Sequence, residues 1–344
     1  YQKCMEEQRV RARSASQFGL DYSDSIRLDG NTEFCGYDRL EDNAQVMALY
    51  SGGEAVDAAG ADTEIVVLLN KTPFYAESGG QVGDSGYLQS DSAKIEIVDC
   101  RKSGDHHLHI GRVLSGDIKV GQQLSAVVDG SVRQATALNH SATHLMHAAL
   151  QKVLGDHVNQ KGSLVNSERL RFDFSHNEAV TPEQLRQIEH IVNGEILSNS
   201  SVDTEVMSMD DAKTKGAMAL FGEKYGDEVR VLSMGGDFSV ELCGGTHVAR
   251  TGDIGQLRIS GESSVASGVR RIEAVTGQKA VALCDEMQDT INNVALVLRA
   301  SGSNVTDKVQ QLSDDNRRLQ KEIDSLKSEL ANASGTDLMS GMRD

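Results

Sequence analysis

The sequence is poor in several residue types, and each shortage excludes a class of protein. Aromatic residues make up 4% of its 344 residues and tryptophan is absent, which argues against a surface built from aromatic platforms for bases. Two prolines exclude a polyproline-rich or collagen-like chain. No apolar run approaches the about 20 residues that a membrane-spanning helix needs. With hydrophobic content at 39%, a packed core is feasible.

Cysteine is scarce as well, and its spacing indicates a reducing compartment. The five cysteines are dispersed without a CxxC pair, so we expect no disulfide framework and predict a cytoplasmic protein. Positive charge is also short, with 34 basic against 51 acidic residues and a net charge of −17. Any RNA contact must therefore be local, through a basic patch on an acidic body.

Pattern changes along the chain divide it into regions. Short β-type runs separated by glycine turns favour a small β-barrel, and the helical period that follows alternates with strands. The predicted fold class is therefore α+β, a β-barrel followed by an α+β domain and then helices. Tyr1 stands in a helical pattern without a preceding Met, so we expect a piece of a longer chain. The predicted regions are the end of an upstream helical region (1–24), the barrel (25–130), the α+β domain (131–277), a helical hairpin or coiled coil (278–332) and a frayed tail (333–344).

Two helices have clear signatures. Thr181-Pro182-Glu183-Gln184 combines an N-cap with a proline in the first turn and predicts a helix to about Ser198. Further on, apolar residues between Val305 and Leu330 repeat in steps of four and three, with Asn316 at one seam position. This seam predicts either a hairpin closed within one chain or self-association through 305–330.

Four residues form a candidate metal site. His140 and His144 stand four apart, which places both imidazoles on one helix face. Cys243 and His247 flank a glycine pair that lets a loop wrap around an ion. Three nitrogens and one sulfur suit Zn²⁺, although packed or solvated histidines are the alternative.

Neighbouring residues narrow the chemistry. Ser141 stands where a metalloprotease HExxH helix carries its general-base Glu, which disfavours a protease. Two roles remain for the metal: a purely structural one, or hydrolysis of an activated ester. His147 shares the helix face, and we expect it to cover the edge of the site. The histidines at 106, 107 and 109 are predicted to lie in a solvated hairpin.

Several motifs resemble those of alanyl-tRNA synthetases, bacterial in character and over nearly the whole chain. They are Thr72-Pro73-Phe74-Tyr75-Ala76-Glu77-Ser78-Gly79-Gly80-Gln81, the His140/His144 helix, Gln160-Lys161-Gly162-Ser163, Arg171-Phe172-Asp173-Phe174-Ser175-His176, Gly222-Glu223-Lys224-Tyr225, Cys243-Gly244-Gly245-Thr246-His247 and Gly268-Val269-Arg270-Arg271-Ile272-Glu273. Met234-Gly235-Gly236-Asp237 has one glycine more than the family pattern, which we expect the turn to absorb.

The resemblance implies an editing portion of alanine–tRNA ligase. Its fold would be the second additional domain shared with threonyl-tRNA synthetase, and its activity would be hydrolysis of mischarged Ser-tRNA(Ala) and Gly-tRNA(Ala). The ATP- and Mg²⁺-dependent domain that activates alanine would be missing. The alternatives are a zinc-stabilised module that binds the tRNA acceptor end without catalysis, or a free-standing trans-editing deacylase, which the unfinished ends disfavour.

The resemblance also assigns residues. It places one Zn²⁺ on His140, His144, Cys243 and His247, and it puts Thr143 and Gln160 near the aminoacyl group as catalytic residues. The basic residues closest in sequence to these motifs are candidate tRNA phosphate contacts, with structural ion pairs as the alternative. They are Lys161, Arg169, Arg171, Arg270 and Arg271.

Overall fold

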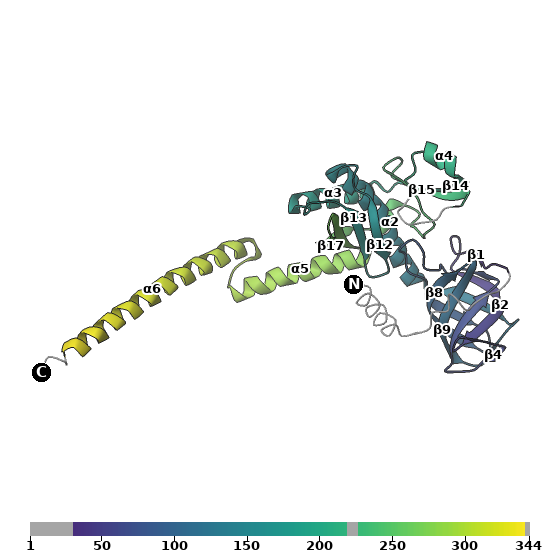
Figure 1. Ribbon diagram of the computed structural model, residues 1–344, viewed down its shortest axis with the longest axis horizontal. Helices are drawn as coiled ribbons and strands as arrows, with labels where there is room; N and C mark the ends of the chain where they lie inside the picture. Colours follow the sequence, from purple (N-terminus) through teal and green to yellow (C-terminus); the bar gives the residue numbers. More distant parts are fainter. Residues whose placement is uncertain (1–29, 219–225, 341–344) are drawn as a thin grey trace. The chain divides into compact units, whose positions relative to one another are not determined.

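The computed structural model describes residues 30–218 and 226–340, without the side chains of 332–340. The predicted helical region 1–24 and the motif at 222–225 lie outside the described residues. The chain forms two compact units, residues 1–280 and 281–344, which are described separately (Figure 1). The larger unit contains the barrel and the α+β domain, which confirms the predicted fold class.

Six antiparallel strands close into the predicted β-barrel. They pair in the order β11-β7-β8-β9-β5-β2, and β2 pairs again with β11, so the ring has no free edge. Alternate residues of β11 point inward, so Leu124, Ala126 and Val128 are buried in the barrel core. The strands are β2 (Glu41–Ser51), β5 (Glu64–Leu69), β7 (Gly86–Gln89), β8 (Lys94–Ser103), β9 (His106–Ser115) and β11 (Gln123–Val128); β3 (Glu54–Val56) adds to β2, β1 (Glu33–Phe34) pairs with β6 (Lys71–Thr72), and β4 (Ala58–Ala59) pairs with β10 (Ile118–Lys119).

The prediction of a solvated histidine hairpin is wrong for two of its three residues. His107 is 8% exposed and His109 is fully buried. The ring of His109 bonds the hydroxyl of Thr72 at 2.7 Å and the carbonyl of Val67 at 3.0 Å. Because both ring nitrogens have partners, the barrel core accommodates a neutral imidazole.

Helix α2 (Gly130–Leu154) follows the barrel directly. Its N-cap is Asp129, whose carboxylate accepts from the amides of Ser131 and Val132. Helix α3 (Pro182–Ser198) begins with the predicted capping box of Thr181 and Gln184 and packs beside α2. Both helices cover an antiparallel sheet, and their apolar faces form one core with Phe172, Phe174 and other inward residues. The sheet has the order β12 (Gln160–Val165), β13 (Leu170–Ser175), β18 (Val269–Thr276) and β17 (Leu257–Ala266).

A second sheet carries the loop with the candidate cysteine. It consists of β14 (Val202–Ser208), β15 (Glu228–Met234) and β16 (Ser239–Leu242), with α4 (Met209–Thr214) after β14 and the 3₁₀ turn η2 (Thr251–Ile254) before β17. Gly235 and Gly236 form the turn between β15 and β16 at φ of 63° and 65°. The turn requires left-handed backbone at both positions, which glycine adopts without strain, and the departure from the family pattern stays a prediction.

A buried ion pair joins the barrel to the α+β domain. Arg133 in the first turns of α2 and Asp84 in the barrel are 6% and 4% exposed. The Arg133 guanidinium donates to both carboxylate oxygens of Asp84 and to the carbonyls of Gly36 and Pro73. Removing one partner would leave a buried charge uncompensated, which typically costs about 3–5 kcal/mol.

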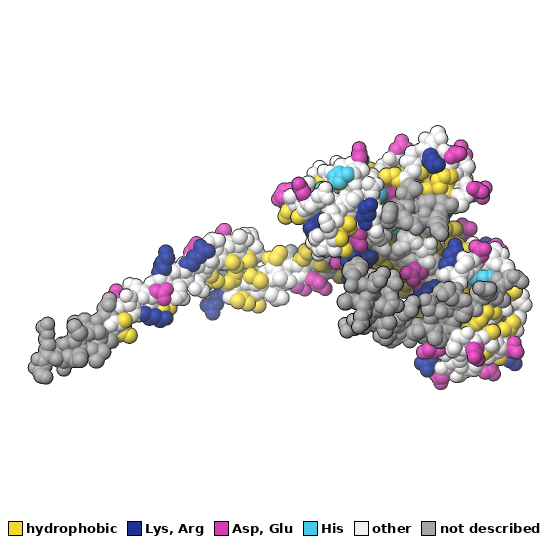
Figure 2. Space-filling view, viewed as in Figure 1, with side chains coloured by type: hydrophobic (Ala, Val, Ile, Leu, Met, Phe, Trp, Pro, Cys, Tyr) yellow, Lys and Arg dark blue, Asp and Glu magenta, His cyan; other side chains and the backbone are white. Residues whose placement is uncertain are grey.

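The smaller unit consists of helices with exposed apolar faces. They are α5 (Gly277–Val297), the 3₁₀ turn η3 (Gly302–Asn304) and α6 (Val305–Ser340). The two helices do not pack along each other, and seam residues such as Leu312 (54%) and Leu319 (52%) are exposed. Figure 2 shows hydrophobic side chains on the surface of this unit. The structure therefore does not show the hairpin alternative, and self-association through 305–330 stays a prediction.

The predicted frayed tail 333–344 is helical as far as Ser340, and residues 341–344 lie outside the described part. Extending an existing helix fixes one residue for each hydrogen bond gained, so α6 continues past the end of its apolar seam. None of the described helices combines the length and apolar character needed to cross a bilayer.

Burial of His109 makes the stability of the barrel depend on pH. Burial lowers the pKa of His109 from 6.5 to about 3. Between these values the unfolded chain binds more protons, so stability falls as the pH drops below 6.5, and the loss levels off below 3. Between pH 7 and pH 5, His109 alone should lower the free energy of unfolding by about 2 kcal/mol. We expect His109→Gln to lose about 2 kcal/mol less over this interval than the unsubstituted chain, measured by urea denaturation; an equal loss contradicts the assignment.

Candidate metal centre

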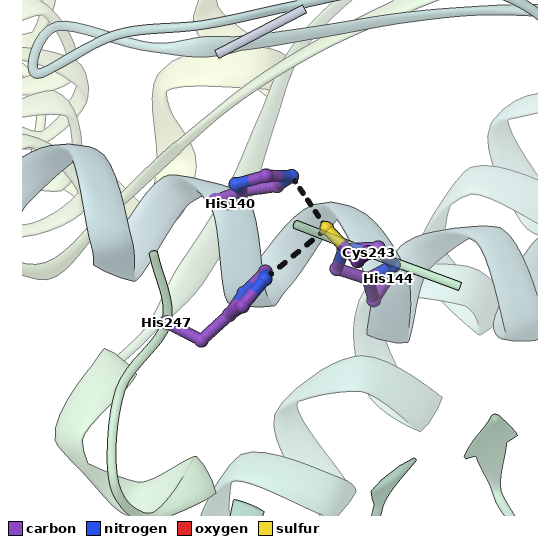
Figure 3. A group of neighbouring side chains, drawn as sticks. All are labelled: His140, His144, Cys243 and His247. Carbon is purple, nitrogen blue, oxygen red and sulfur yellow. Dashed lines mark hydrogen bonds between the residues drawn. The ribbon is translucent and has the colours of Figure 1, made fainter. Parts of the chain in front are cut away.

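Two distant segments bring the four predicted ligands together. Helix α2 supplies His140 and His144 one turn apart, and the loop after β16 supplies Cys243 and His247 (Figure 3). One ligand atom from each of the four lies within 4.8 Å of all the others. Cys243 and both helical histidines are buried, and His247 is half-buried.

The separations fit a tetrahedral ion. With ligand distances of about 2.0–2.3 Å, neighbouring nitrogen and sulfur ligands stand about 3.5 Å apart. The Cys243 Sγ atom lies 3.6 Å from His140 Nε2 and 3.2 Å from His247 Nε2. The Nε2 atom of His144 is buried without a hydrogen-bond partner. A buried nitrogen in this state is stabilised when a metal accepts its lone pair.

Each histidine is oriented through its other ring nitrogen. His140 Nδ1 lies 2.7 Å from Gln81 Oε1, and His144 Nδ1 lies 2.5 Å from Glu241 Oε2. His247 Nδ1 lies 3.5 Å from Ser141 Oγ. Bonds at Nδ1 leave Nε2 directed at the centre, the usual arrangement for zinc-binding histidines.

Gln81 connects the barrel to this centre. Its Oε1 accepts from the Thr246 amide at 2.9 Å, and its Nε2 donates to Thr246 Oγ1 at 2.9 Å. Because the backbone amide can only donate, Oε1 is fixed as the acceptor and His140 Nδ1 must donate to it. Gly80 bends the preceding turn at φ of 88°, and its carbonyl accepts from the Val165 amide. The glycine turn therefore places the fully buried Gln81 side chain against the metal loop.

Steric fit at Gly245 and three hydrogen bonds hold the metal loop in place. A Cβ atom at position 245 would collide with the His140 ring, so the glycine there is required by space. The Arg230 guanidinium donates to the carbonyls of Cys243 and Gly245 at 3.0 and 3.1 Å. The Tyr37 hydroxyl donates to the Gly244 carbonyl at 2.6 Å. The loop conformation is therefore fixed by the protein itself.

The charges in the cluster suit a metal cation. Burial raises the pKa of the Cys243 thiol, but the surrounding imidazoles reverse this and hold it well below its ordinary value. Glu241 is buried, which raises its pKa, yet His144 and His147 lower it to about 2. Burial lowers the pKa of His144, whereas Glu241 and Cys243 raise it to about 10. A metal ion bound by His144 would have to displace the proton that Glu241 and Cys243 stabilise there, so binding at neutral pH would release protons.

His147 lies beside the four ligands rather than among them. It is 4% exposed, and its Nδ1 atom lies 2.8 Å from Glu241 Oε1. The Glu241 carboxylate thus joins His147 to His144. His147 belongs to the support of the site, in keeping with its predicted place at the edge.

The predicted aminoacyl residues lie outside the four-ligand cluster. Thr143 is 4% exposed, and its hydroxyl donates to the Asn139 carbonyl of its own helix at 2.8 Å. Gln160 is the half-buried first residue of β12, opposite Phe174. Their roles stay predictions.

The candidate tRNA-binding arginines are engaged with acidic partners. Arg271 bonds Asp173 at 2.6 and 2.8 Å, and Arg171 lies 3.7 Å from the same carboxylate. Arg270 pairs with Glu262 at 2.6 Å, and Arg169 pairs with Glu273 at 3.4 Å. These pairs favour the structural alternative for the four arginines, while Lys161 is exposed on β12.

Sequence reasoning missed the residues that support the ligands. Glu241 stands two residues before Cys243 on the edge of a strand, where a period of two puts both on one face, and this signal could have revealed it. Gln81 ends the motif that begins at Thr72, but nothing in its sequence surroundings indicates contact with a helical residue 59 positions away. Tyr37 and Arg230 carry no sequence signal for their roles.

Comparison with known proteins agrees with this geometry. Residues 229–273, which include the metal loop, match the family of threonyl and alanyl tRNA synthetase second additional domains, and residues 1–132 match the family of class II (A) tRNA synthetases. The whole chain is 58% identical to an alanine–tRNA ligase of Saccharophagus degradans, and 98% of it is 55% identical to that of Pseudomonas fluorescens. The chain spans 39% of the length of each.

These matches define the chain as part of an aminoacyl-tRNA synthetase. Its family is that of the alanine–tRNA ligases, and two of the four candidate ligands, Cys243 and His247, lie in the segment that matches the second additional domain.

Glu241 provides a test of how the ligands are held. In Glu241→Gln an amide replaces the carboxylate that orients His144. Its NH₂ group must then face the Nδ1–H group of His144 or His147, so that two donors oppose each other. Loss of such a support typically weakens metal binding about 10- to 100-fold. We expect this loss for Zn²⁺ in competition with a chromophoric chelator. The control is Glu228→Gln, an exposed position on the adjacent strand β15, which should bind as the unsubstituted chain does. Equal affinities for both variants contradict the role of Glu241.

Proposed function

We propose that this portion of an alanine–tRNA ligase removes wrong amino acids from tRNA(Ala), hydrolysing Ser-tRNA(Ala) and Gly-tRNA(Ala). The observation that carries the proposal is the four-ligand centre, built by α2 and the second-additional-domain segment beside a cavity. Water would add to the ester carbonyl, the ribose hydroxyl would leave with a proton, and serine or glycine would be released as the free acid. We assign ATP- and Mg²⁺-dependent activation of alanine to the part of the related ligases that this chain does not cover. We also propose that the protein acts in the cytoplasm.

The donor set suits one Zn²⁺ per chain, held by His140, His144, Cys243 and His247. Thiolate and imidazole ligands are those that zinc selects, and the support of every Nδ1 atom fits this ion. When bound, zinc supplies Lewis-acid polarisation of a carbonyl or hydroxyl oxygen.

The buried carboxylate of the site is not available as a general base. Both oxygens of Glu241 are engaged by imidazoles, and Ser141, which follows His140, has no basicity at neutral pH. Glu241 and Ser141 therefore do not supply the base that amide hydrolysis by a metalloprotease uses. An aminoacyl ester is more reactive than an amide, so positioning the ester and an attacking water is a sufficient task for this site.

Selectivity for serine requires a polar group near the side chain of the substrate. We propose Thr143 and Gln160 for this role: the Thr143 hydroxyl donates to Asn139, which leaves its oxygen free to accept from a serine hydroxyl or an ammonium group. Alanine would leave such a buried group unpaired, and sites of this kind reject substrates that lack the matching hydroxyl.

Cys243→Ala tests the proposal. Removing the thiolate should abolish stoichiometric zinc and slow single-turnover deacylation of seryl-tRNA(Ala) by about 100-fold or more, the usual range for a lost transition-state contact. Cys284→Ala, a half-buried position on α5, is the matched control and should keep zinc and activity. Full activity in zinc-free protein would end the metal hypothesis. An unsubstituted chain that binds tRNA and zinc but never deacylates would identify a binding module.

A further inference from the structure

A cavity of about 240 Å³ opens beside the metal centre, and three aromatic residues are among those that line it. Phe34, Tyr37 and Tyr75 line it from the barrel region. His140 lines it from α2, and Cys243 and Gly244 line it from the metal loop. These three aromatic residues gather in one place in a chain with seven Phe, seven Tyr and no Trp. Support of the metal loop accounts for the Tyr37 hydroxyl, but it does not account for the rings of Phe34 and Tyr75.

The rings are held in fixed orientations. Phe34 packs edge to face with Tyr37 and Tyr75, with ring centroids 4.9 and 6.0 Å apart. The Arg230 guanidinium lies over the Tyr37 ring at 4.3 Å from its centroid, while the Tyr37 hydroxyl is bonded to the metal loop. Tyr37 nevertheless remains 47% exposed, whereas Tyr75 is 7% exposed and supports Phe34 from behind the accessible surface. A preorganised ring with so much accessible surface is suited to binding a flat ligand.

The substrate indicates which flat ligand this is. A seryl or glycyl group has no flat ring that could stack on an aromatic side chain. The ester, however, is carried by the ribose of the last nucleotide of tRNA, an adenosine, whose base extends away from the reacting carbonyl. Unpaired bases at RNA ends are recognised by stacking on aromatic side chains.

We propose that Phe34, Tyr37 and Tyr75 form a binding site for the terminal adenine of the tRNA, with the esterified ribose between them and the metal centre. The inference rests on the proposed function for the position of the ester. Lys102 also lines the cavity, and the Arg230 guanidinium lies over the Tyr37 ring at the edge of the cavity. Both offer positive charge to the phosphate that precedes the terminal nucleoside.

Binding of the base is tested without catalysis. The probe is an uncharged RNA minihelix with the tRNA(Ala) acceptor stem and 2-aminopurine in place of the terminal adenine, added to saturating zinc-loaded protein. Stacking on a ring should quench the fluorescence of this base. We expect quenching with the unsubstituted chain and with Tyr37→Phe, which keeps the ring, and loss of quenching with Tyr37→Leu. Tyr87→Leu, an exposed tyrosine elsewhere on the barrel, is the control and should quench normally.

Kinetics separate base binding from loop positioning. Stacking of one base on an aromatic ring corresponds to about 5- to 150-fold in affinity, so Tyr37→Leu should raise the KM for a seryl-minihelix by a factor in this range. Tyr37→Phe loses only the bond to Gly244, and its effect should fall on kcat with KM nearly unchanged. Zinc content is measured in each variant. Phe34→Leu should raise KM as well, which gives a second test at an independent position.

The outcomes distinguish this inference from the proposed function. A deacylating chain with no quenching, or with the same KM in the Leu variants, would overturn the adenine site and leave the editing activity in place. Quenching that depends on Tyr37 in a chain that never deacylates seryl-tRNA would support the adenine site and contradict the proposed function. Quenching in Tyr37→Leu and Phe34→Leu equal to that of the unsubstituted chain would place the base elsewhere.

Discussion

The side-chain amide of Gln81 is the contact on which the metal centre depends. Gln81 follows a glycine turn of the barrel, and its Oε1 atom accepts from His140 on α2 and from the amide of Thr246 in the metal loop. It therefore links the two segments that supply the ligands. The Arg133–Asp84 pair holds the same two domains together at the start of α2. The barrel therefore sets the orientation of a ligand and the position of the loop, and is part of the site's construction.

Burial and charge cooperate at this centre. Isolated from water, three imidazoles and a thiolate would be costly to keep together without an ion, because each desolvated polar atom needs a partner. The structure provides partners at every Nδ1 atom and leaves the Nε2 atom of His144 without one. The unpartnered Nε2 atom of His144 lies within the four-ligand cluster, which favours a metal site, whereas the unpartnered Nε2 atom of His147 lies beside that cluster.

The sequence was informative where the signal is local. The capping box at Thr181, the alternation in the barrel strands and the four-residue spacing of His140 and His144 each depend on a short segment, and the elements follow them. It failed for His109, since polar histidines beside a turn resemble a solvated hairpin until the strands close around them. It could not separate a structural arginine from a phosphate-binding one at Arg270 or Arg271, because that depends on acidic residues from other strands.

The ligand types, their spacing and the family were thus set by the amino-acid sequence alone, because helical and strand periods are properties of neighbouring residues. The tertiary structure decided which distant side chains support them: Gln81, Glu241, Ser141 and Arg230 reach the centre only because the barrel, α2 and the sheet of β16 meet there. It also decided that a chain short of aromatic residues brings Phe34, Tyr37 and Tyr75 together beside the metal loop. Contacts of this kind depend on how the chain folds back on itself, and no local pattern encodes them.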